Sequence, residues 1–597
     1  MAEEIRKREE IDAKYKWDLT HIYSSDETWK ADFDRVQTKI EEMGAALNGT
    51  VAENPKRAVR AYFDLQKEIL PVFEYAFLRK ETDNTDPVAQ GLKDRAIRLL
   101  VQAQTAGAFL EPELLAMDEN ALLALAADEE MKDYDVYLRS VIRNKSHTLT
   151  KDQEELIAMM GEVAEAPDMI FTSLTEADMK LPPVRMKDGT ERELTEGNYS
   201  TFIHDTDRDV RSQAFRNLMN TYQSFGNTIA ATYGASVKKD QFMAVSHHYE
   251  SARQAAMAPF EIPEEVYDNL IQVVHEAIPI LQEYLSLRKK AMGLGELHLY
   301  DLYVPMVDDF EMKLPYEKAF DLVLKGLRPM GEDYLSKLRE ARDNGWIDVF
   351  PSAGKSSGAF SAGDLADVHP YVLLNHNDNL DSAFTIAHEL GHSMHSFFSN
   401  TNQPFPKNDY SLFVAEVASI CNECVMMRFL LQTMTEKKAQ AYLLNHFLEQ
   451  FRTTCFRQTM FAEFEKISHE MAQQGIPLTK ESLSKKYFEL NELYYGQSCV
   501  VDEEIAAEWM RIPHFYRAFY VYVYATGLCA AVSLSDRILN EGEKAVRDYR
   551  KFLSAGCSVP PIEALKLAGI DMSQPEPLRK AMNVFRETVE KMKEVLA

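Results

Sequence analysis

The chain has 597 residues, which is too many for one ordinary compact core, so we expect two or more domains or one large helical body. Its residues are 46% hydrophobic and 27% charged, which is the usual balance of a globular protein in water. The formal net charge of -28 argues against nucleic acids and anionic membrane surfaces as partners.

The N-terminal sequence predicts where the protein resides. Its first residues are charged, and no apolar segment of the kind found in secretory signals follows them. A membrane-spanning helix requires a run of about 18 or more apolar residues, and the sequence contains none. We therefore expect a cytoplasmic protein with no membrane partner.

Most of the sequence predicts α-helices. A capping-box pattern at residues 150–153 begins an amphipathic helix. Pro263 and the two acidic residues after it mark the first turn of a second helix. Similar helical patterns occupy residues 316–343, 436–472 and 575–596.

Few segments predict strands. Residues 181–194 read as a hairpin with Asp188 and Gly189 at its turn, and residues 371–374 form a short apolar strand. A weakly marked boundary after the hairpin divides the chain into an N-terminal helical region, residues 1–200, and a larger region, residues 201–597. The glycine- and serine-rich residues 353–358 are either a plain connector or a mobile loop over a cleft.

All six cysteines lie in the C-terminal third, and in a large cytoplasmic chain we expect them to be reduced. Cys421 and Cys424 form a C-x-x-C pattern, which can bind zinc or carry out redox chemistry. No second pair lies at zinc-ribbon spacing, and the surrounding sequence predicts the middle of a helix. We expect buried structural thiols, with a functional role as the alternative.

A candidate metal site begins with the pattern His388-Glu389-Leu390-Gly391-His392. On one helix, His388 and His392 lie on the same face, about 6 Å apart along the axis. Both imidazoles can therefore reach one tetrahedral zinc ion. Glu389 lies about 100° around the helix from His388, beside the ion, where a general base for a zinc-bound water belongs.

The sequence around this pattern supports a helix. Asp381 or Ser382 is expected to cap its start. Gly391 within a helix costs about 1 kcal/mol relative to alanine. We expect this glycine because another helix or the substrate approaches the backbone closely there.

A catalytic zinc site needs a third protein ligand and leaves its fourth position for water. The next predicted helix, residues 411–434, carries Glu416 among apolar neighbours, where an acid is expected to be paired or metal-bound. Glu423 lies seven residues further on the same stripe. We assign Glu416 as the third ligand and Glu423 as the acceptor that orients a ligand imidazole. Asp381 competes for the orienting role, although a helix cap is its simpler interpretation.

Three blocks of the sequence resemble peptidase family M3, the thimet oligopeptidase-like metallopeptidases, and within it the oligoendopeptidase F group. Residues 388–395 resemble the active-site helix of the family, residues 413–419 the segment with the third ligand, and residues 511–527 its His/Tyr-rich segment. Weaker similarities elsewhere extend the resemblance over nearly the whole chain. The resemblance implies a mainly α-helical, two-lobed body with a deep central channel, a few short strands near the zinc site, and residues 201–597 as the catalytic domain. It also implies short peptide substrates.

The His/Tyr-rich segment can also be interpreted from its residues alone. Tyrosine hydroxyls and a histidine N–H can donate hydrogen bonds to the oxyanion of a tetrahedral intermediate or to substrate carbonyls. The candidates, in falling order, are His514, Tyr520, Tyr522 and Tyr524. The alternative for about half of them is a core aromatic with a satisfied hydroxyl.

The predicted reaction is zinc-dependent endopeptidase cleavage of short unstructured oligopeptides, with one zinc ion per chain. In this scheme Glu389 takes a proton from the attacking water and passes it to the leaving amine. We also consider that the strand at residues 371–374 pairs with the extended peptide.

Three other functions are weighed against this prediction. A metallocarboxypeptidase on the same zinc motif stays open, because the groove ends decide between terminal and internal cleavage. A peptide-binding protein with a structural zinc would need a fourth protein ligand, for which His395 is the nearby candidate. A metzincin is excluded, because His395 and Phe398 occupy the positions where that class has glycine and histidine.

Overall fold

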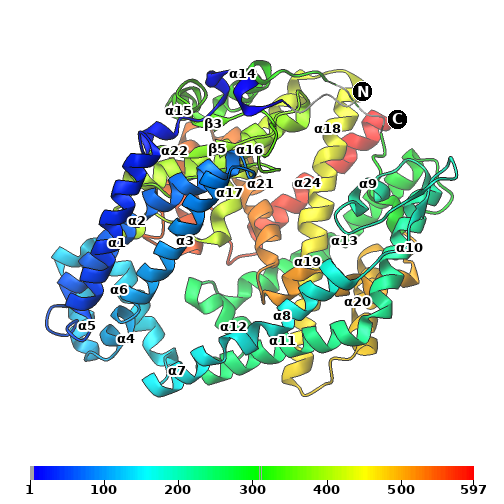
Figure 1. Ribbon diagram of the computed structural model, residues 1–597. Helices are drawn as coiled ribbons and strands as arrows, with labels where there is room; N and C mark the ends of the chain where they lie inside the picture. The colour runs from blue at the N-terminus through cyan, green and yellow to red at the C-terminus, as the bar shows by residue number, and fades with distance from the viewer. Residues whose placement is uncertain (1–5, 308–309, 311) are drawn as a thin grey trace. The chain divides into compact units, whose positions relative to one another are not determined.

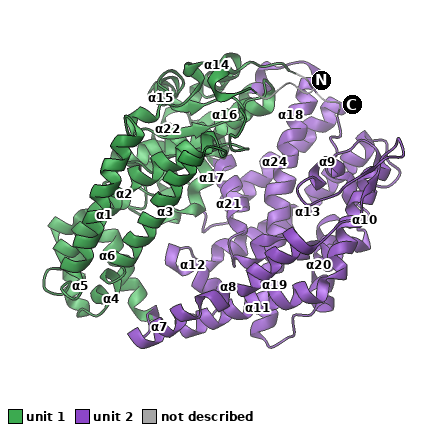
Figure 2. Cartoon of the chain, in the orientation of Figure 1, with its two compact units in different colours: residues 1–146, 311–429, 534–571 green, residues 147–310, 430–533, 572–597 purple. Residues whose placement is uncertain are grey.

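The computed structural model describes residues 6–307, 310 and 312–597. It is mainly α-helical with a few short strands, which confirms the expected fold class (Figure 1). The chain divides into two compact units, each built from three segments (Figure 2). Unit 1 comprises residues 1–146, 311–429 and 534–571, and unit 2 comprises residues 147–310, 430–533 and 572–597. The division near residue 200 stays a prediction, since it separates sequence regions whereas these units interleave.

Unit 1 begins with a helical layer whose starts are marked in the sequence. Ser25 caps α1 by accepting a hydrogen bond from the Thr28 amide, while Asn54 and Asp86 cap helices that begin with proline. Trp29 lies with Ile69 and Leu99 in the core that these three helices share. The helices of this layer are α1 (Asp26–Leu47), α2 (Pro55–Thr82), α3 (Pro87–Gly107), α4 (Leu110–Leu115), α5 (Glu119–Ala126) and α6 (Asp135–Asn144).

The rest of unit 1 surrounds a three-stranded sheet. The strand order is β3-β5-β4, where β3 (Ile347–Asp348) is parallel to β5 (Tyr371–Leu373) and β4 (Phe360–Ala362) is antiparallel to it. The sheet packs on α16 (Leu380–Asn402). The other helices of this part are α14 (Tyr316–Gly326), α15 (Glu332–Asp343), most of α17 (Leu412–Thr433), the end of α21 (Tyr522–Glu541), α22 (Glu543–Leu553) and α23 (Pro561–Leu567).

The strand expected at residues 371–374 is present as β5, but the idea that it pairs with substrate is wrong. Val372 is paired with Ile347 on one side and with Ser361 on the other. Both hydrogen-bonding edges of β5 are therefore occupied within the sheet. The edge strands of the described sheet are β3 and β4, and β4 packs on α16.

Unit 2 is built on a core of aromatic side chains. Tyr233, Phe464, Trp509 and Phe515 pack with ring centroids 5.1 to 6.2 Å apart. The helices of this unit are α7 (Lys151–Met159), α8 (Gly161–Thr172), α9 (Tyr199–Ile203), α10 (Arg208–Ser224), α11 (Gly226–Ser246), α12 (Ala252–Met257), α13 (Glu264–Ala291), α18 (Lys437–Gln450), α19 (Arg457–Gln473), α20 (Lys480–Tyr495), the start of α21 and α24 (Glu576–Leu596).

Several local expectations are confirmed in unit 2. The capping box at Thr150 and Gln153 begins α7. The expected hairpin pairs β1 (Val184–Arg185) with β2 (Glu191–Arg192), and Gly189 takes the left-handed conformation at its turn. The apolar face expected for this amphipathic helix is not buried, because Leu156 is 61% exposed.

The glycine- and serine-rich residues 353–358 are attached to the body of unit 1 through a buried lysine. Nζ of Lys355 lies 2.8 Å from a carboxylate oxygen of Asp348 and donates to the carbonyl oxygens of Phe350 and Leu374. The Asp348 carboxylate also pairs with Arg8. These contacts support the connector interpretation of this segment.

The cysteines are free thiols, and Cys421 and Cys424 are buried as expected. Burial raises the pKa of Cys421 to about 12, which keeps the thiol protonated and unreactive. None of the helices in the described part of the chain is long and apolar enough to cross a bilayer.

Candidate metal centre

The first two candidate ligands lie on α16. This helix is capped by Asn379, whose side chain accepts a hydrogen bond from the Ser382 amide at 2.8 Å. The cap expected at Asp381 or Ser382 is therefore wrong. Asp381 and Ser382 lie in the first turn of the helix, where the Ser382 hydroxyl accepts a hydrogen bond from the Asn377 amide. Beyond this turn the helix buries Ala387, Leu390 and other apolar residues against unit 1, which fixes its rotation about its axis.

The helical spacing brings His388 and His392 together as predicted. Their Nε2 atoms are 3.2 Å apart and their ring centroids 4.9 Å apart. Both nitrogens therefore point toward one location beside the helix.

Helix α17 contributes Glu416 to the same location. Its carboxylate Oε2 lies 3.4 Å from Nε2 of His388 and 3.5 Å from Nε2 of His392. Ligand atoms about 2.1 Å from a tetrahedral zinc ion are separated by roughly 3.4 Å, so the three observed separations fit one such ion. Among the described residues, these three form the group of histidine and acidic side chains that can hold a metal ion.

Close packing of the two helices makes this geometry possible. A Cβ atom on Gly391 would lie 2.5 Å from Cα of Ser419 and 2.7 Å from the carbonyl oxygen of Ala418. The expected close approach at Gly391 is thus confirmed, and the neighbour is α17. Asn422 strengthens the contact by donating a hydrogen bond to the carbonyl oxygen of Ala387 at 2.9 Å. Sequence reasoning missed Asn422, which is buried, although an amide within a largely apolar stretch is a signal that the sequence does contain.

Glu423 contacts the other nitrogen of His388, as its spacing from Glu416 predicted. Its Oε1 is hydrogen-bonded to Nδ1 of His388. Burial lowers the pKa of His388, but the hydrogen bond and charge of Glu423 outweigh burial and raise this pKa to about 9. The contact directs Nε2 toward the metal position.

The carboxylates of the site respond differently to their surroundings. Burial raises the pKa of Glu416, but the hydrogen bond and charge of His392 outweigh it and lower this pKa to about 2. Glu389 is 6% exposed, and its burial raises its pKa although both imidazoles act in the opposite direction. The ligand Glu416 thus stays ionised, whereas the neighbouring carboxyl group of Glu389 has a raised proton affinity.

His395 has no part in the ligand set. Its ring is 1% exposed and stacks on Tyr410 with the centroids 3.6 Å apart. Burial lowers the pKa of His395 to about 3, so the imidazole is neutral. The role of fourth ligand considered for His395 is wrong, because the ring packs in the core.

Three of the four residues proposed from the His/Tyr-rich segment form a cluster in unit 2. Nε2 of His514 lies 3.4 Å from the hydroxyl of Tyr524, and the rings of Tyr520 and Tyr524 are 5.4 Å apart. Burial and nearby arginines lower the pKa of His514, which leaves it neutral. Tyr522 lies apart from this cluster, 2% exposed and packed against Tyr267.

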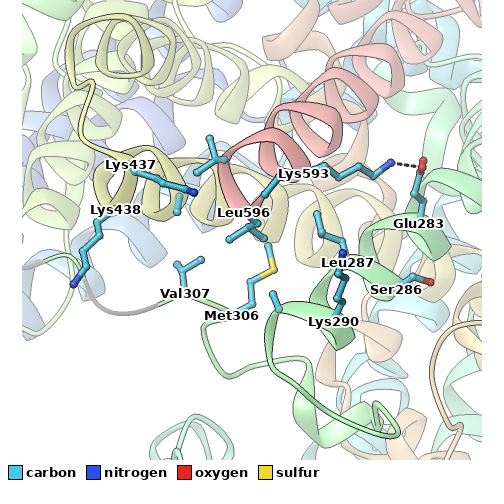
Figure 3. Close-up of a pocket in the computed structure, with 14 residues that line it drawn as sticks. Glu283, Ser286, Leu287, Lys290, Met306, Val307, Lys437, Lys438, Lys593 and Leu596 are labelled. Atoms are coloured by element: carbon cyan, nitrogen blue, oxygen red, sulfur yellow. Dashed lines mark hydrogen bonds and ion pairs between the residues drawn. The ribbon is translucent and has the colours of Figure 1, made fainter.

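Two recesses differ in how near they lie to the candidate site residues. One of about 360 Å³ adjoins the start of α16 and is lined by Thr385, one turn before His388. A larger recess of about 880 Å³ lies within unit 2, where Lys290, Lys437, Lys438 and Lys593 line it (Figure 3). The larger recess includes none of the candidate site residues. The smaller one lies on the helix face that carries the metal ligands.

Comparisons with known proteins find relatives that match nearly the whole chain. The profile of peptidase family M3 matches residues 201–584, and a profile described as oligopeptidase F matches residues 113–180. Oligopeptidase PepF of Bacillus subtilis is 43% identical over 100% of this chain and 89% of its own length. Group B oligopeptidase PepB of Streptococcus agalactiae is 37% identical over 99% of this chain and 98% of its own length.

Solved structures extend the likeness to the fold. A crystal structure of a protein from Chlamydophila abortus has a TM-score of 0.93 at 32% identity, over 99% of this chain and 100% of that one. Oligoendopeptidase F from Enterococcus faecium has a TM-score of 0.74 at 32% identity, over 96% and 99% of the two chains. The resemblance seen in the sequence is confirmed: the chain belongs to peptidase family M3 and is a metallo-oligopeptidase.

Proposed function

We propose that this protein is a zinc-dependent endopeptidase that cleaves short unstructured oligopeptides. The observation that supports it most is the set of three ligand atoms on α16 and α17, separated by 3.2, 3.4 and 3.5 Å. Two imidazoles and one carboxylate are the donor set of a catalytic zinc site with an open fourth position. His388, His392 and Glu416 would hold the ion, which when bound supplies a Lewis acid and an acidified water.

Glu389 is the proposed general base. It follows His388 on α16, interacts electrostatically with both ligand imidazoles and is not one of the three ligand side chains. The raised pKa of Glu389 suits it to accept a proton from the attacking water and then to release that proton to the leaving amine. Glu423 acts through His388 by holding the orientation of that ring.

The substrate backbone is proposed to pair with the outer edge of β4. The hydroxyl of Ser361 lies 2.8 Å from that of Ser393, and a Cβ atom on Gly363 would lie 2.3 Å from Cβ of Ser396. The strand therefore runs alongside α16 at the level of the metal ligands. An extended peptide added to this edge would satisfy its own backbone groups next to the catalytic residues.

His514, Tyr520 and Tyr524 are proposed to donate hydrogen bonds to the oxyanion or to substrate carbonyls. The three side chains are partly exposed and lie together, with His514 neutral. Phenol and imidazole donors of this kind stabilise charge that develops in the transition state. Tyr522 is left out of the proposal because its ring is buried against Tyr267.

The experiment that tests this function compares wild type with Glu389→Gln on an internally quenched oligopeptide blocked at both ends. We expect the variant to retain its zinc and to lose about 10³-fold in rate, because only the general base is removed. Zinc content is measured in both preparations. A variant that loses its metal, or that keeps its rate, contradicts the role of Glu389.

The same substrate separates the alternatives. Internal cleavage of a peptide with blocked ends, identified by mass spectrometry of the products, is expected for an endopeptidase. Release of single residues from an unblocked C-terminus, with the blocked peptide intact, would indicate a metallocarboxypeptidase. Zinc retention without any hydrolysis would indicate a binding protein.

A further inference from the structure

The chain takes an unusual backbone conformation immediately before Tyr520. Phe519 has φ of 53°, in the left-handed region that favours glycine. A phenylalanine has no short polar side chain to stabilise this conformation locally, so contacts from elsewhere must hold it. The strained residue lies between His514 and the first turn of α21, and it sets the direction in which the chain enters Tyr520.

A buried acid on another helix binds this strained residue. Glu465 of α19 is 0% exposed, and its Oε1 accepts a hydrogen bond from the backbone N–H of Phe519 at 2.8 Å. The Phe519 ring is itself 5% exposed and lies 4.7 Å from the ring of His469 and 5.8 Å from that of Tyr267. Both the amide and the ring of Phe519 are therefore fixed by side chains distant in the sequence.

The surroundings of Glu465 suit an uncharged carboxyl group. Burial, together with the negative charge of Asp240, raises the pKa of Glu465 well above its usual range. The hydroxyl of Tyr267 donates to the carbonyl oxygen of Ala462 at 2.6 Å, so its oxygen is able to accept. Oε2 of Glu465 is 3.5 Å from that hydroxyl. A protonated carboxyl can therefore accept from Phe519 through one oxygen and donate toward Tyr267 through the other.

The groups that face Glu465 come from several elements. Nδ1 of His469 donates a hydrogen bond to the backbone carbonyl oxygen of Glu465 at 2.9 Å, and Nε2 of the same ring lies 3.3 Å from a carboxylate oxygen of Asp240. Tyr233 and Tyr267 come from α11 and α13 and are fully buried. Glu465 is therefore surrounded by two tyrosine hydroxyl groups, the imidazole of His469 and the carboxyl group of Asp240.

We propose that Glu465 is a positioning residue, whose buried carboxyl group accepts the hydrogen bond from the Phe519 amide, holds the left-handed turn there and thereby fixes the direction of Tyr520. The proposal rests on the proposed role of His514, Tyr520 and Tyr524 in binding the oxyanion or the substrate. Glu465 itself touches no reacting atom. It acts on the reaction through the backbone that carries the tyrosine cluster.

The first test compares three variants in the zinc-loaded enzyme. Glu465→Gln keeps an acceptor for Phe519 and a donor toward Tyr267, whereas Glu465→Met removes both. Glu463→Met is the matched control, because Glu463 lies on the same helix but contacts His275 and Tyr494. We expect Glu465→Met to lower kcat about 10- to 100-fold with little change in KM, because displacements of about 1 Å have effects of this size. Glu465→Gln and Glu463→Met should stay within about threefold of wild type.

Two results of this comparison would overturn the proposal. A Glu465→Gln variant as slow as Glu465→Met would show that a charged carboxylate is required. Equal kinetic effects of Glu465→Met and Glu463→Met would show a general loss of stability. Hydrogen–deuterium exchange of the peptide spanning residues 512–524 adds a readout independent of catalysis. Exchange there should rise in Glu465→Met and stay at the wild-type level in Glu465→Gln.

A second pair of variants tests the backbone strain itself. Phe519→Gly and Phe519→Ala both remove the ring, but only glycine enters the left-handed region freely. Adding Glu465→Met should therefore lower kcat more in the alanine background, by at least about fivefold relative to the glycine background. Equal effects in the two backgrounds would contradict an anchoring role.

Tyr520→Phe distinguishes failure of this inference from failure of the proposed function. If Tyr520 is a donor, its variant should lose about 10²-fold in kcat, as for other oxyanion donors. A fully active Tyr520→Phe would remove the proposed role of this tyrosine, and with it the kinetic part of the inference. The exchange experiment would still decide whether Glu465 holds the turn.

Discussion

The α16–α17 pair and the segment of residues 511–524 hold their functional side chains by different means. In the helix pair, His388, His392 and Glu416 are placed by regular helical spacing and by the contact that Gly391 permits. In the other segment, 3-10 turns and a left-handed residue at Phe519 precede the helix that carries Tyr524. The first arrangement depends on local periodicity and the second on distant contacts.

This difference predicts how each region responds to substitution. The metal ligands lie on two long helices that pack against each other. Removing one ligand should therefore leave the fold intact while abolishing metal binding. The tyrosine segment is held at its strained residue by a hydrogen bond to the buried Glu465 and by ring contacts with His469 and Tyr267. Changes there should alter catalysis without altering metal content.

The largest effect is expected for Glu416→Ala. The substitution removes the carboxylate that completes the ligand set, so zinc should be lost on dialysis and the peptidase rate should fall by about 10³-fold or more. Metal analysis and hydrolysis of the blocked peptide measure both. Glu332→Ala is the control, because Glu332 is an exposed acid of unit 1 and its loss should change neither quantity. A Glu416→Ala variant that retains stoichiometric zinc would contradict the assignment.

A smaller effect is expected for Glu423→Ala. This residue touches Nδ1 of His388 and makes no contact with the metal position, so the ligand set remains complete. Loss of such an orienting acid typically lowers metal affinity or activity by about 10- to 100-fold. Competition with a zinc chelator measures the affinity. An unchanged dissociation constant would mean that packing alone orients His388.

The sequence predicted the helix pair well because its geometry follows from residue spacing. Residues four apart share a helix face, which was enough to join His388 with His392. Glu423 was found because it lies two turns after Glu416 on the same helix. The cap at Asn379 was missed, since neighbouring polar residues are also capable caps and the choice depends on where the chain leaves β5.

The tyrosine cluster could be predicted only in part. Tyr522 and Tyr524 are two residues apart on α21, so their side chains point about 160° away from each other. Sequence alone did not show where this helix begins, and therefore which tyrosine faces the core. Nothing in the sequence marks Phe519 as left-handed, because no glycine or asparagine stands there. The neighbours of β5 were likewise hidden, since they come from residues 347–348 and 360–362.

The smallest expected effect is a pH dependence of the Tm, which arises in the α16–α17 pair only when no metal is bound. In the absence of metal, the pKa of His388 is raised from 6.5 to about 9, chiefly by Glu423 acting against burial. A raised pKa means that the folded state holds this proton more tightly than the unfolded state. The stabilisation is therefore complete below pH about 6.5 and is lost as the pH rises through about 9.

We accordingly expect the Tm of the chelator-stripped protein to fall by roughly 2–6 °C across this range. The zinc-loaded protein should lack this decline, because the ion takes the place of the proton on His388. Stripped Glu423→Ala should also show a weaker decline, since the acid that raises the pKa of His388 is gone. Differential scanning fluorimetry of the three samples at matched ionic strength measures the slopes. Equal slopes in all three would place the titrating group outside the α16–α17 pair, and the metal-free site would then hold no extra proton.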